Sequence, residues 1–574
     1  MVAQALDQLP EFTTTGKAAE VTVERTRDSK YGDFASNIAM RLARVAGGKP
    51  RELAQLIIHK LPESDLIDKM EVAGPGFINF YISRTAFHRE IALIIDKGDQ
   101  YGRGESNPDT RYLIEFVSAN PTGPLHVGHG RLAAFGATLA NLLQTAGYPV
   151  DREYYVNDAG RQMDILGVSV WLRALQTAGL DFAFPEAGYQ GDYIRDIAAT
   201  VCDRRVLTLS VELLYENVPP DAPDGDREDH IDALIERAGT LLGNEAFGAL
   251  RQKSLEIIRN EIRDDLAEFG VEFDCWFSEQ GLARQGHIND ALSELGERNM
   301  LYEKDGATWF RATKFGDEKD RVVIRDNGMK TYFASDIAYH YHKRKRGYGM
   351  MLDILGADHH GYVARVRAGL QAMGYEKDCL EVPLVQFVSL YRGGKKLSMS
   401  TRSGEFISLR QLREEVGNDA ARFFYVSRSN DQHLDFDMEL AKSRSNENPV
   451  YYIQYAHARV ASVFRQLQEK SLCWDSANGA ANLRHLVEDH ESALMSRLSR
   501  YPEIIETAAR NRAPQYLVHY LRELANDFHA YYNAHLFIVE DKDLRDARLT
   551  LIVATQIVIA NSLRIIGVSA PDSM

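Results

Sequence analysis

An apolar run, a turn broken by proline and glycine, and the start of a helical pattern follow one another between residues 112 and 131. The turn carries Gly123, Gly128 and two histidines three positions apart, His126 and His129. A strand, a tight turn and a helix start in this order aim backbone N–H groups and the positive end of the helix dipole at one point. This stretch therefore predicts a site for a nucleotide triphosphate, with both histidines facing phosphates.

The pattern after the turn predicts a long helix that begins near Gly130 and ends at Gly147. Its apolar positions share one face: Leu132, Phe135, Leu139, Leu142 and Ala146. A strand joined to a crossover helix in this way is typical of a doubly wound parallel sheet, in which ligands bind beyond the carboxyl ends of the strands.

Spacing argues against other ligands at this turn. Neither a dinucleotide fingerprint nor a P-loop occurs in it. Zinc binding by His126 and His129 would need a cysteine or a third histidine at ligand spacing, and none follows. A plain helix cap would be the better interpretation of a lone His-x-x-His, but the flanking strand and helix favour the nucleotide site.

Size and composition narrow the class of protein. A chain of 574 residues predicts about three or four domains. Its four cysteines lack Cys-x-x-Cys spacing, which argues against a zinc ribbon or a disulfide framework and fits a reducing compartment. The N-terminus shows no secretory pattern, and polar residues interrupt the apolar stretch 549–568, which predicts a buried helix. We expect a cytoplasmic protein with no membrane partner.

The net charge of −15 gives no support for nucleic-acid binding, although it does not forbid it. Residues 340–346 form a candidate basic patch, for which a solvated helix end is an equally good interpretation. The acidic loop 219–229 should face away from any polyanion.

Changes in pattern along the chain predict three domains. Residues 1–108 indicate a small α+β unit, with Phe34, Ile38 and Leu42 on a helical face and a strand over 77–82. Residues 109–445 alternate helices with strand candidates and contain a helix-rich insertion at about 165–275. Residues 446–574 are helical throughout. The strand candidates are 112–117, 322–324, 351–355 and 384–390.

The fold class that follows is α/β: a Rossmann-like doubly wound parallel sheet as the catalytic domain, with an N-terminal α+β domain and a C-terminal all-α helical bundle. Two apolar stripes support the bundle. They are Ile453, Ala456, Val460, Phe464 and Leu467, and Leu517, Leu521, Leu524, Phe528 and Tyr531.

His126-Val-Gly-His129 resembles the first signature of the class I aminoacyl-tRNA synthetases. The longer string over 115–131, Glu-Phe-Val-Ser-Ala-Asn-Pro-Thr-Gly-Pro-Leu-His-Val-Gly-His-Gly-Arg, resembles the bacterial-type arginyl-tRNA synthetases. Other segments agree in the family's order over most of the chain, namely 31–40, 73–80, 152–160, 331–339 and 355–363. A four-residue signature alone is weak, whereas this ordered set is specific.

The resemblance implies a two-step reaction. ATP with Mg²⁺ and L-arginine give arginyl-adenylate, and the arginyl group then moves to the 3′-terminal ribose of tRNA(Arg). In this family activation typically waits for bound tRNA. The N-terminal domain would grip the tRNA elbow and the C-terminal domain would bind the anticodon. We expect a monomer with no protein-bound metal.

The resemblance also assigns residues. The ATP-binding set is Gly123, His126, Gly128, His129, Asp358, His359, Met399 and Ser400. The arginine-binding set is Glu115, Ser118, Asn120, Tyr332, Asp336 and Tyr339. Adjacent histidines after Asp358 leave a zinc pair as a second interpretation of that segment, although adjacency is poor geometry for one metal.

Two of these assignments have a physical rationale. The attacking carboxylate is already ionised, so the first step needs alignment and positive charge around the phosphates rather than a general base. A guanidinium needs a carboxylate and, preferably, an aromatic face. Three candidate residues share one side of a helix, because Asp336 follows Tyr332 by four positions and Tyr339 follows Asp336 by three. Without the resemblance to the family, the preferred interpretation would be a surface cap for Asp336 and an ordinary core residue for Tyr332.

A second basic loop supplies the candidate catalytic cations beside His126 and His129: Lys395, Lys396 and Arg402. The loop resembles the second class I signature, Lys-Met-Ser-Lys-Ser, but departs from it. Aligned on Met399 and Ser400, its lysine positions hold Ser398 and Thr401, and its last serine position holds Arg402. A basic surface loop is the alternative, and which lysine acts stays open.

Two other function classes stay open at this point. The altered loop is compatible with a catalytically weakened relative that binds tRNA as a regulator, although the intact histidine turn and Asp336 speak against it. A small-molecule nucleotidyltransferase would have no use for the first and last domains.

Overall fold

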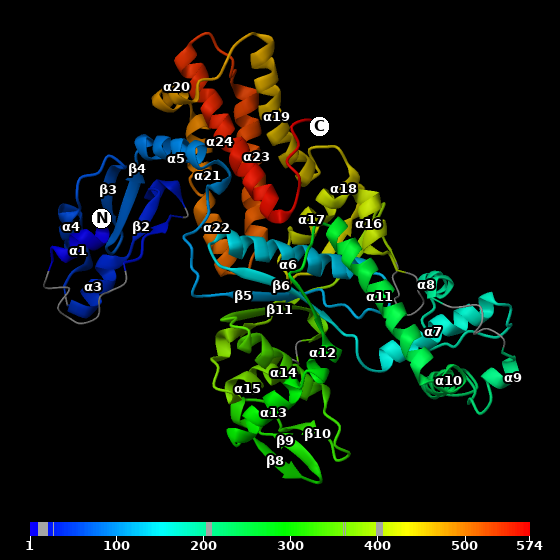
Figure 1. Ribbon diagram of the computed structural model, residues 1–574. Coiled ribbons are helices and arrows are strands. Elements are labelled where there is room, and N and C mark those ends of the chain that lie inside the picture. The colour runs from blue at the N-terminus through cyan, green and yellow to red at the C-terminus, as the bar shows by residue number, and fades with distance from the viewer. Residues whose placement is uncertain are drawn as a thin grey trace.

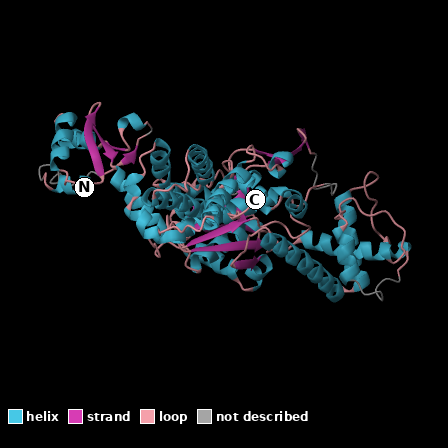
Figure 2. Cartoon of the chain, turned by 90° about the horizontal axis from the view of Figure 1, so that it is seen from above, coloured by secondary structure: helices cyan, strands magenta, loops and turns pink. Residues whose placement is uncertain are grey.

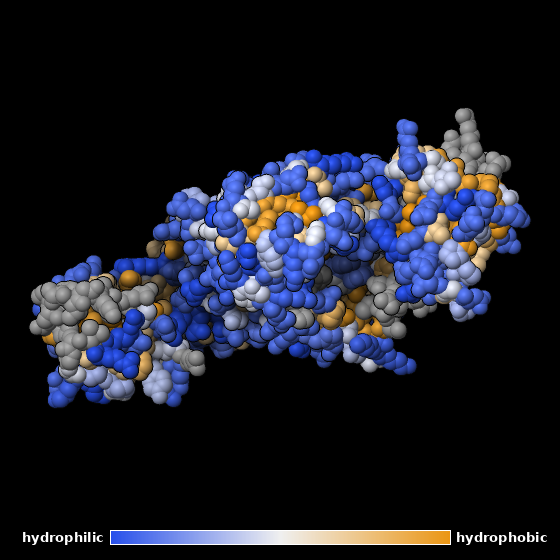
Figure 3. Space-filling model, turned by 90° about the horizontal axis from the view of Figure 1, so that it is seen from below, coloured by the Kyte–Doolittle hydropathy of each residue, from blue (hydrophilic) through white to orange (hydrophobic). Residues whose placement is uncertain are grey.

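The computed structural model describes residues 1–9, 21–26, 28–46, 48–201, 209–359, 361, 363–397 and 406–574. Figure 1 shows the N-terminal unit (blue) beside a helical bundle (orange and red), with the parallel sheet beneath the bundle and the helical insertion on the opposite side. Seen from above, the molecule is elongated, with the N-terminal unit and the insertion at its two ends (Figure 2). The face seen from below is mainly hydrophilic (Figure 3).

The N-terminal unit is a four-stranded antiparallel sheet with helices packed on it, as expected for an α+β domain. The strand predicted over 77–82 is confirmed. The helical face expected to include Phe34 was wrong there, because Phe34 lies in a strand paired with Phe80, and the helix begins only at Ile38. The elements are α1 (Val2–Asp7), β1 (Glu24–Arg25), β2 (Phe34–Ser36), α3 (Ile38–Ala46), α4 (Pro50–Lys60), β3 (Ile67–Ala73), β4 (Phe77–Ile82) and α5 (Arg84–Lys97).

The central sheet is parallel, with the strand order β12-β11-β5-β6-β7 and β13 beside β11. Of the strands in this sheet, β5 comes first along the chain, and it lies between β11 and β6, so the sheet extends from it in both directions. Such a switch point opens a crevice at the carboxyl ends of the strands. The predicted doubly wound fold is confirmed. The strands are β5 (Tyr112–Phe116), β6 (Val150–Val156), β7 (Cys275–Ser278), β11 (Met350–Gly356), β12 (Leu380–Glu381) and β13 (Leu384–Val385).

Two strand candidates lie elsewhere than expected. Residues 322–324 fall in β10, which pairs antiparallel with β9 in a separate sheet that also contains β8. Residues 384–390 divide between β13 and β14, and β14 joins β15 and β16 in a fourth sheet. A short apolar run specifies a strand but not its partner. These strands are β8 (Leu301–Lys304), β9 (Ala307–Phe310), β10 (Arg321–Ile324), β14 (Val388–Arg392), β15 (Lys395–Lys396) and β16 (Leu434–Asp437).

Helix α6 (Val127–Thr145) packs closely on β5. An added Cβ at Gly136 would lie 2.3 Å from Cγ of Phe116. The helices of the insertion and of the rest of this region are α7 (Arg161–Thr177), α8 (Tyr193–Val201), α9 (Val211–Leu214), α10 (Arg227–Leu242), α11 (Asn244–Glu268), α12 (Glu279–Arg284), α13 (His287–Glu297), α14 (Tyr332–Lys345), α15 (Val363–Ala372), α16 (Leu409–Val416), α17 (Asn418–Val426) and α18 (Met438–Lys442).

The C-terminal bundle consists of α19 (Pro449–Glu469), α20 (Ser476–Ala481), α21 (Asp489–Leu498), α22 (Tyr501–Arg510), α23 (Gln515–Ala534) and α24 (Lys542–Ile566). Both predicted apolar stripes face its core. Within the described ranges, α24 alone has the length and hydropathy of a membrane span, but 72% of its apolar window is buried inside the protein. The prediction of a buried helix there is confirmed. Arg422 on α17 holds the end of α24 by donating to the Ile566 carbonyl at 2.9 Å.

Candidate active site

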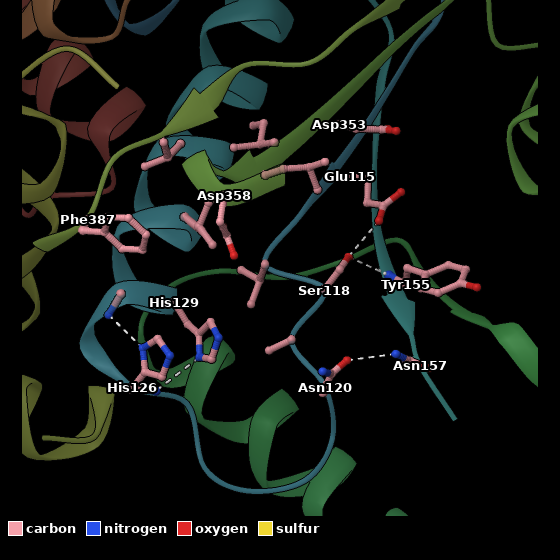
Figure 4. Close-up of a pocket in the computed structure, with 18 of the residues that line it drawn as sticks. Glu115, Ser118, Asn120, His126, His129, Tyr155, Asn157, Asp353, Asp358 and Phe387 are labelled. Carbon is pink, nitrogen blue, oxygen red and sulfur yellow. Dashed lines mark hydrogen bonds between the residues drawn. The ribbon is translucent and has the colours of Figure 1, made fainter. Parts of the chain in front are cut away.

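A cavity of about 460 Å³ opens at the carboxyl end of the parallel sheet, where the switch point predicts a ligand site (Figure 4). It brings together seven of the residues assigned from sequence: Glu115, Ser118, Asn120, His126, Gly128, His129 and, from the turn after β11, Asp358. Tyr155, Asn157, Asp353 and Phe387 line it as well, although none of them was assigned to the site from sequence.

The two signature histidines stack on each other at the start of α6. Their ring centroids are 3.7 Å apart, with 17° between the planes. Nδ1 of His126 accepts a hydrogen bond from Gly128 N at 3.1 Å, and Nδ1 of His129 accepts from His126 N at 3.3 Å. His126 is thus the N-cap, and the helix begins at Val127, not near Gly130 as expected. An imidazole acceptor replaces the usual Ser or Asp cap.

Burial lowers the pKa of both histidines, and His126 lowers that of His129 further. Both rings are therefore neutral at pH 7. Since each Nδ1 accepts a backbone hydrogen bond, the ring proton of each lies on Nε2. The pair can donate two N–H groups beside the positive end of α6, which is the chemistry that a triphosphate needs.

The chain leaves β5 through an unusual backbone turn. Val117 and Ser118 have φ values of 68° and 38°, in the left-handed region that residues other than glycine seldom adopt. The turn brings the Ser118 hydroxyl within 3.0 Å of Glu115 Oε1 and of Tyr155 N. It also places Asn120 at the cavity wall, where its Oδ1 accepts from Asn157 Nδ2 at 2.9 Å. Backbone strain of this kind is concentrated at functional sites.

The three candidate residues on α14 occupy different surroundings. Tyr332 begins the helix and is 72% exposed. Tyr339 is buried, with its hydroxyl between Glu115 Oε2 at 2.8 Å and Glu153 Oε1 at 2.7 Å, so it supports Glu115 from below the cavity. Asp336 lies close enough to raise the pKa of Tyr155, although burial raises that pKa more.

An acidic cluster lies beside Tyr155, and only one of its three members, Asp336, was assigned from sequence. Burial, and then the charges of Asp158 and Asp336, raise the pKa of Glu279 to about 7. Asp158 is held in place by Ser278 Oγ at 2.6 Å and by Gln280 N at 2.8 Å. Three carboxyl groups gathered in this way are suited to a cationic ligand. Glu279 follows a short strand and precedes a helix, and nothing in its local sequence marks it.

The second basic loop is only partly described. Met399, Ser400 and Arg402 lie outside the described residues. Lys395 and Lys396 stand exposed on β15, in a hairpin that turns at two glycines with positive φ. Neither lysine is among the described residues that line the cavity. The chain after the loop is joined to the signature turn, because Val127 N donates to Ile407 O at 3.3 Å and Leu409 N donates to Leu125 O at 2.8 Å.

Two assigned positions remain. Gly123 lies not in this cavity but in a neighbouring one of about 580 Å³, between the signature turn and residues 186–193 of the insertion. Asn120, His126 and His129 line both cavities. His359 lies in the 3₁₀ turn Ala357–His359, and its side chain is outside the described part of the chain.

Comparison with known proteins identifies the family. The chain is 55% identical over 579 residues to an arginine–tRNA ligase of Thioalkalivibrio sulfidiphilus, covering 100% of this chain and 99% of that relative. The chain belongs to the arginyl-tRNA synthetase family. An arginine–tRNA ligase of Hydrogenovibrio crunogenus is 53% identical to this synthetase, over 96% of this chain and 95% of that one.

Three family descriptions match successive parts of the synthetase. They are the arginyl-tRNA synthetase N-terminal domain over residues 1–82, the class I (R) catalytic domain over 90–181 and 239–443, and the DALR anticodon-binding domain over 453–574. The predicted resemblance is confirmed. The known reaction of the family is two-step, ATP-dependent aminoacylation, and this synthetase is a class I arginine–tRNA ligase.

Solved structures agree in fold. An arginyl-tRNA synthetase structure from Campylobacter jejuni matches with a TM-score of 0.73 and 31% identity, covering 86% of this synthetase and 100% of that chain. The Thermus thermophilus arginyl-tRNA synthetase matches with a TM-score of 0.74 and 23% identity over 100% and 98% of the two chains.

Proposed function

We propose that this synthetase forms arginyl-adenylate in the cavity at the end of β5, with ATP phosphates at the histidine pair and the arginine side chain at the acidic cluster. The observation that carries the proposal is that the neutral histidine pair and Tyr155 line the same switch-point cavity, and that the carboxyl groups of Asp158, Glu279 and Asp336 gather beside Tyr155. The two sites have opposite electrostatic character, which matches the two substrates.

At the phosphate side, Nε2 of His126 and of His129 would donate to phosphate oxygens, and the α6 dipole adds positive potential where the pentacoordinate phosphorus gains negative charge. Phe387, 61% exposed at the cavity rim, offers a face for adenine, with Gly128 and Asp358 nearby.

Mg²⁺ would arrive with ATP. Among the described residues, no group of three or more His, Cys, Asp or Glu could hold a metal ion. Phosphates and water would hold the cation, with at most one or two protein carboxylates, as is common for Mg²⁺. Bound there, Mg²⁺ would neutralise phosphate charge. Lys395, Lys396 and Arg402 are proposed to supply further positive charge to the departing pyrophosphate.

At the arginine side, Glu115 and Asn120 would hold the α-amino end, and Ser118 fixes Glu115. The guanidinium would lie against Asp336, Glu279 and the Tyr332 ring. A carboxylate pair and an aromatic face recognise a planar guanidinium better than they recognise an ammonium. This geometry favours arginine over lysine.

The tRNA would contact all three predicted domains. The second cavity shares the signature turn with the first and suits the 3′-terminal nucleotide, because transfer requires its ribose beside the adenylate. On the C-terminal domain (446–574), the guanidinium of Arg459 lies 4.5 Å from the Tyr455 ring and 4.4 Å from the Tyr532 ring, a surface on which bases can stack. Residues 1–108 would hold the tRNA elbow. We also propose a cytoplasmic monomer whose arginine activation waits for tRNA.

Charging of unfractionated tRNA with each of the twenty amino acids in turn tests this proposal. Arginine alone should be attached, with AMP and pyrophosphate as products. If tRNA bound but no amino acid were attached, the chain would be a tRNA-binding relative with lost catalysis. Adenylation of a small molecule without tRNA would instead indicate a nucleotidyltransferase.

A further inference from the structure

Three carboxylates stand in a row across the central strands of the sheet. Asp353 on β11 is the register partner of Glu115 on β5, which is in turn the partner of Glu153 on β6. Register partners project from the same face of a sheet, and all three side chains are buried. Buried carboxylates this close repel one another strongly unless cations lie between them.

Helix α14 places its polar face on this row. Lys343 Nζ donates to Glu115 Oε2 at 2.6 Å and to Asp353 Oδ1 at 2.8 Å. Arg346 donates two hydrogen bonds to Glu153, at 2.5 and 2.8 Å. The polar face is completed by Tyr339, between Glu115 and Glu153, and by His340, whose Nε2 lies 2.5 Å from Asp353 Oδ2.

Lys343 is the cation shared by two members of the row, and its side chain is fully buried. Burial alone would lower its pKa, but the charges of Asp353 and Glu115 raise it above the ordinary value, so it carries a proton at neutral pH. The same contact lowers the pKa of Asp353 against the opposing effect of burial.

The two oxygens of Glu115 therefore have different surroundings. Oε2 is bonded to Lys343 and Tyr339 beneath the cavity, whereas Oε1 accepts from the Ser118 hydroxyl at the cavity wall. Figure 4 shows Glu115 and Asp353 above Ser118 on this side of the cavity. Lys343 also lies two helical turns after Asp336, so it anchors the helix that carries the proposed partner of the guanidinium.

We propose that Lys343 is a positioning residue for the amino-acid site: it offsets the repulsion between Glu115 and Asp353 and holds Oε1 of Glu115 toward the α-ammonium group of arginine. The inference rests on the proposed function, in which Glu115 receives that group. Lys343 itself does not touch substrate. The cations Lys343 and Arg346 and the His340 ring face the three carboxyl groups of the row, and the α-ammonium group would add a positive charge on the cavity side of Glu115.

The test is arginylation by K343M, with the arginine KM and the ATP KM measured from pH 6 to pH 9. Without the lysine, no cation would lie between Glu115 and Asp353, and their mutual repulsion would favour a proton shared between the two carboxyl groups. At pH 7 the arginine KM of K343M should be about 10- to 100-fold above the wild-type value, while the ATP KM stays nearly flat. As the pH is raised, the arginine KM of K343M should fall more steeply than that of the wild type, in which Glu279 already titrates near pH 7. K345M, at an exposed position of the same helix, is the matched control and should behave as the wild type.

The double variant K343M/D353N separates positioning from folding. It removes the lysine together with the carboxylate that would compete for the proton, so Glu115 should ionise again and the arginine KM should recover most of the loss. K343R should recover part of it, because the charge is kept. Thermal unfolding of each variant identifies any that has lost its fold, and the double variant and K343R remain informative if K343M does not fold.

Equal losses for arginine and ATP would overturn the proposal. So would an arginine KM in K343M with the same pH dependence as in the wild type and no recovery in K343M/D353N. E115Q distinguishes an error in the proposed arginine site from an error in the role of Lys343. If E115Q leaves the arginine KM unchanged, the proposed arginine site is wrong. If E115Q raises it and K343M does not, only the role of Lys343 fails.

Discussion

Nε2 of both His126 and His129 carries the ring proton, because a backbone N–H group occupies Nδ1 of each ring. The two residues cap the same helix and stack at 3.7 Å, so neither can turn without disturbing the other. The local backbone thereby sets the tautomer that a phosphate-binding donor requires. This relationship makes the signature a structural unit as well as a chemical one.

His129→Ala should slow adenylate formation by about 10²- to 10⁴-fold with little change in the arginine KM, since the lost donor would stabilise charge that develops in the transition state. Single-turnover adenylate formation measures this. His129→Gln keeps a donor near the Nε2 position and should recover part of the rate, whereas His129→Asn keeps only a group near Nδ1 and should not. Equal rates for the two variants would show that His129 acts through packing and not as a hydrogen-bond donor.

The histidine pair should also make stability depend on pH. The folded pKa of each ring lies below the unfolded value of about 6.5, so their contribution to stability is full above about pH 6.5 and is lost as the pH falls toward the folded pKa. Urea unfolding between pH 8 and pH 5 should show a decline that is smaller in the variant His126→Gln/His129→Gln. An identical decline in that variant would show that other groups are responsible.

Glu279 should release a proton when arginine binds. Its pKa is raised to about 7, so the group is partly protonated in the free enzyme, and a guanidinium beside it would favour the ionised form. Calorimetry of arginine binding to the enzyme–tRNA complex at pH 6.5, in two buffers of different ionisation enthalpy, measures the release. Glu279→Gln should abolish it. A buffer-independent heat in the wild type would place Glu279 outside the arginine site.

Asp336→Asn should raise the arginine KM by about 10²-fold or more, because a guanidinium would lose its charged partner in a half-buried site. The ATP KM is the internal control and should hardly move. Steady-state arginylation measures both constants. An unaltered arginine KM would remove Asp336 from the pocket, whatever the outcome for Glu279.

Gly136→Ala should destabilise the protein by about 1–3 kcal/mol, because the added methyl group would overlap the Phe116 ring and push α6 away from β5. Gly248→Ala is the matched control: it also lies within a helix, nothing lies within 4 Å of its added Cβ, and it should be neutral or stabilising by up to about 1 kcal/mol. Urea unfolding compares the two. Similar effects would show that the close approach of α6 and β5 is not important for stability.

The sequence alone predicted the elements whose pattern is local. Consecutive or helically spaced residues define each of these elements: the strand over 112–117, the turn with two histidines and the two apolar stripes of the bundle. The motifs and their order along the chain were also sufficient to predict the family. Helix starts were predicted less well, because the cap of α6 is a histidine and the start of α3 depends on the pairing of Phe34 with Phe80.

The tertiary structure decided what lies side by side. Asp353, Glu115 and Glu153 are far apart in the chain, and they form a row only because β11, β5 and β6 are neighbours in the sheet. Glu279 acquires its raised pKa from burial and from two carboxylates that long crossovers bring to it. Strand order and burial depend on the whole folded chain, so a local sequence pattern of period 2 or 3.6 does not predict them.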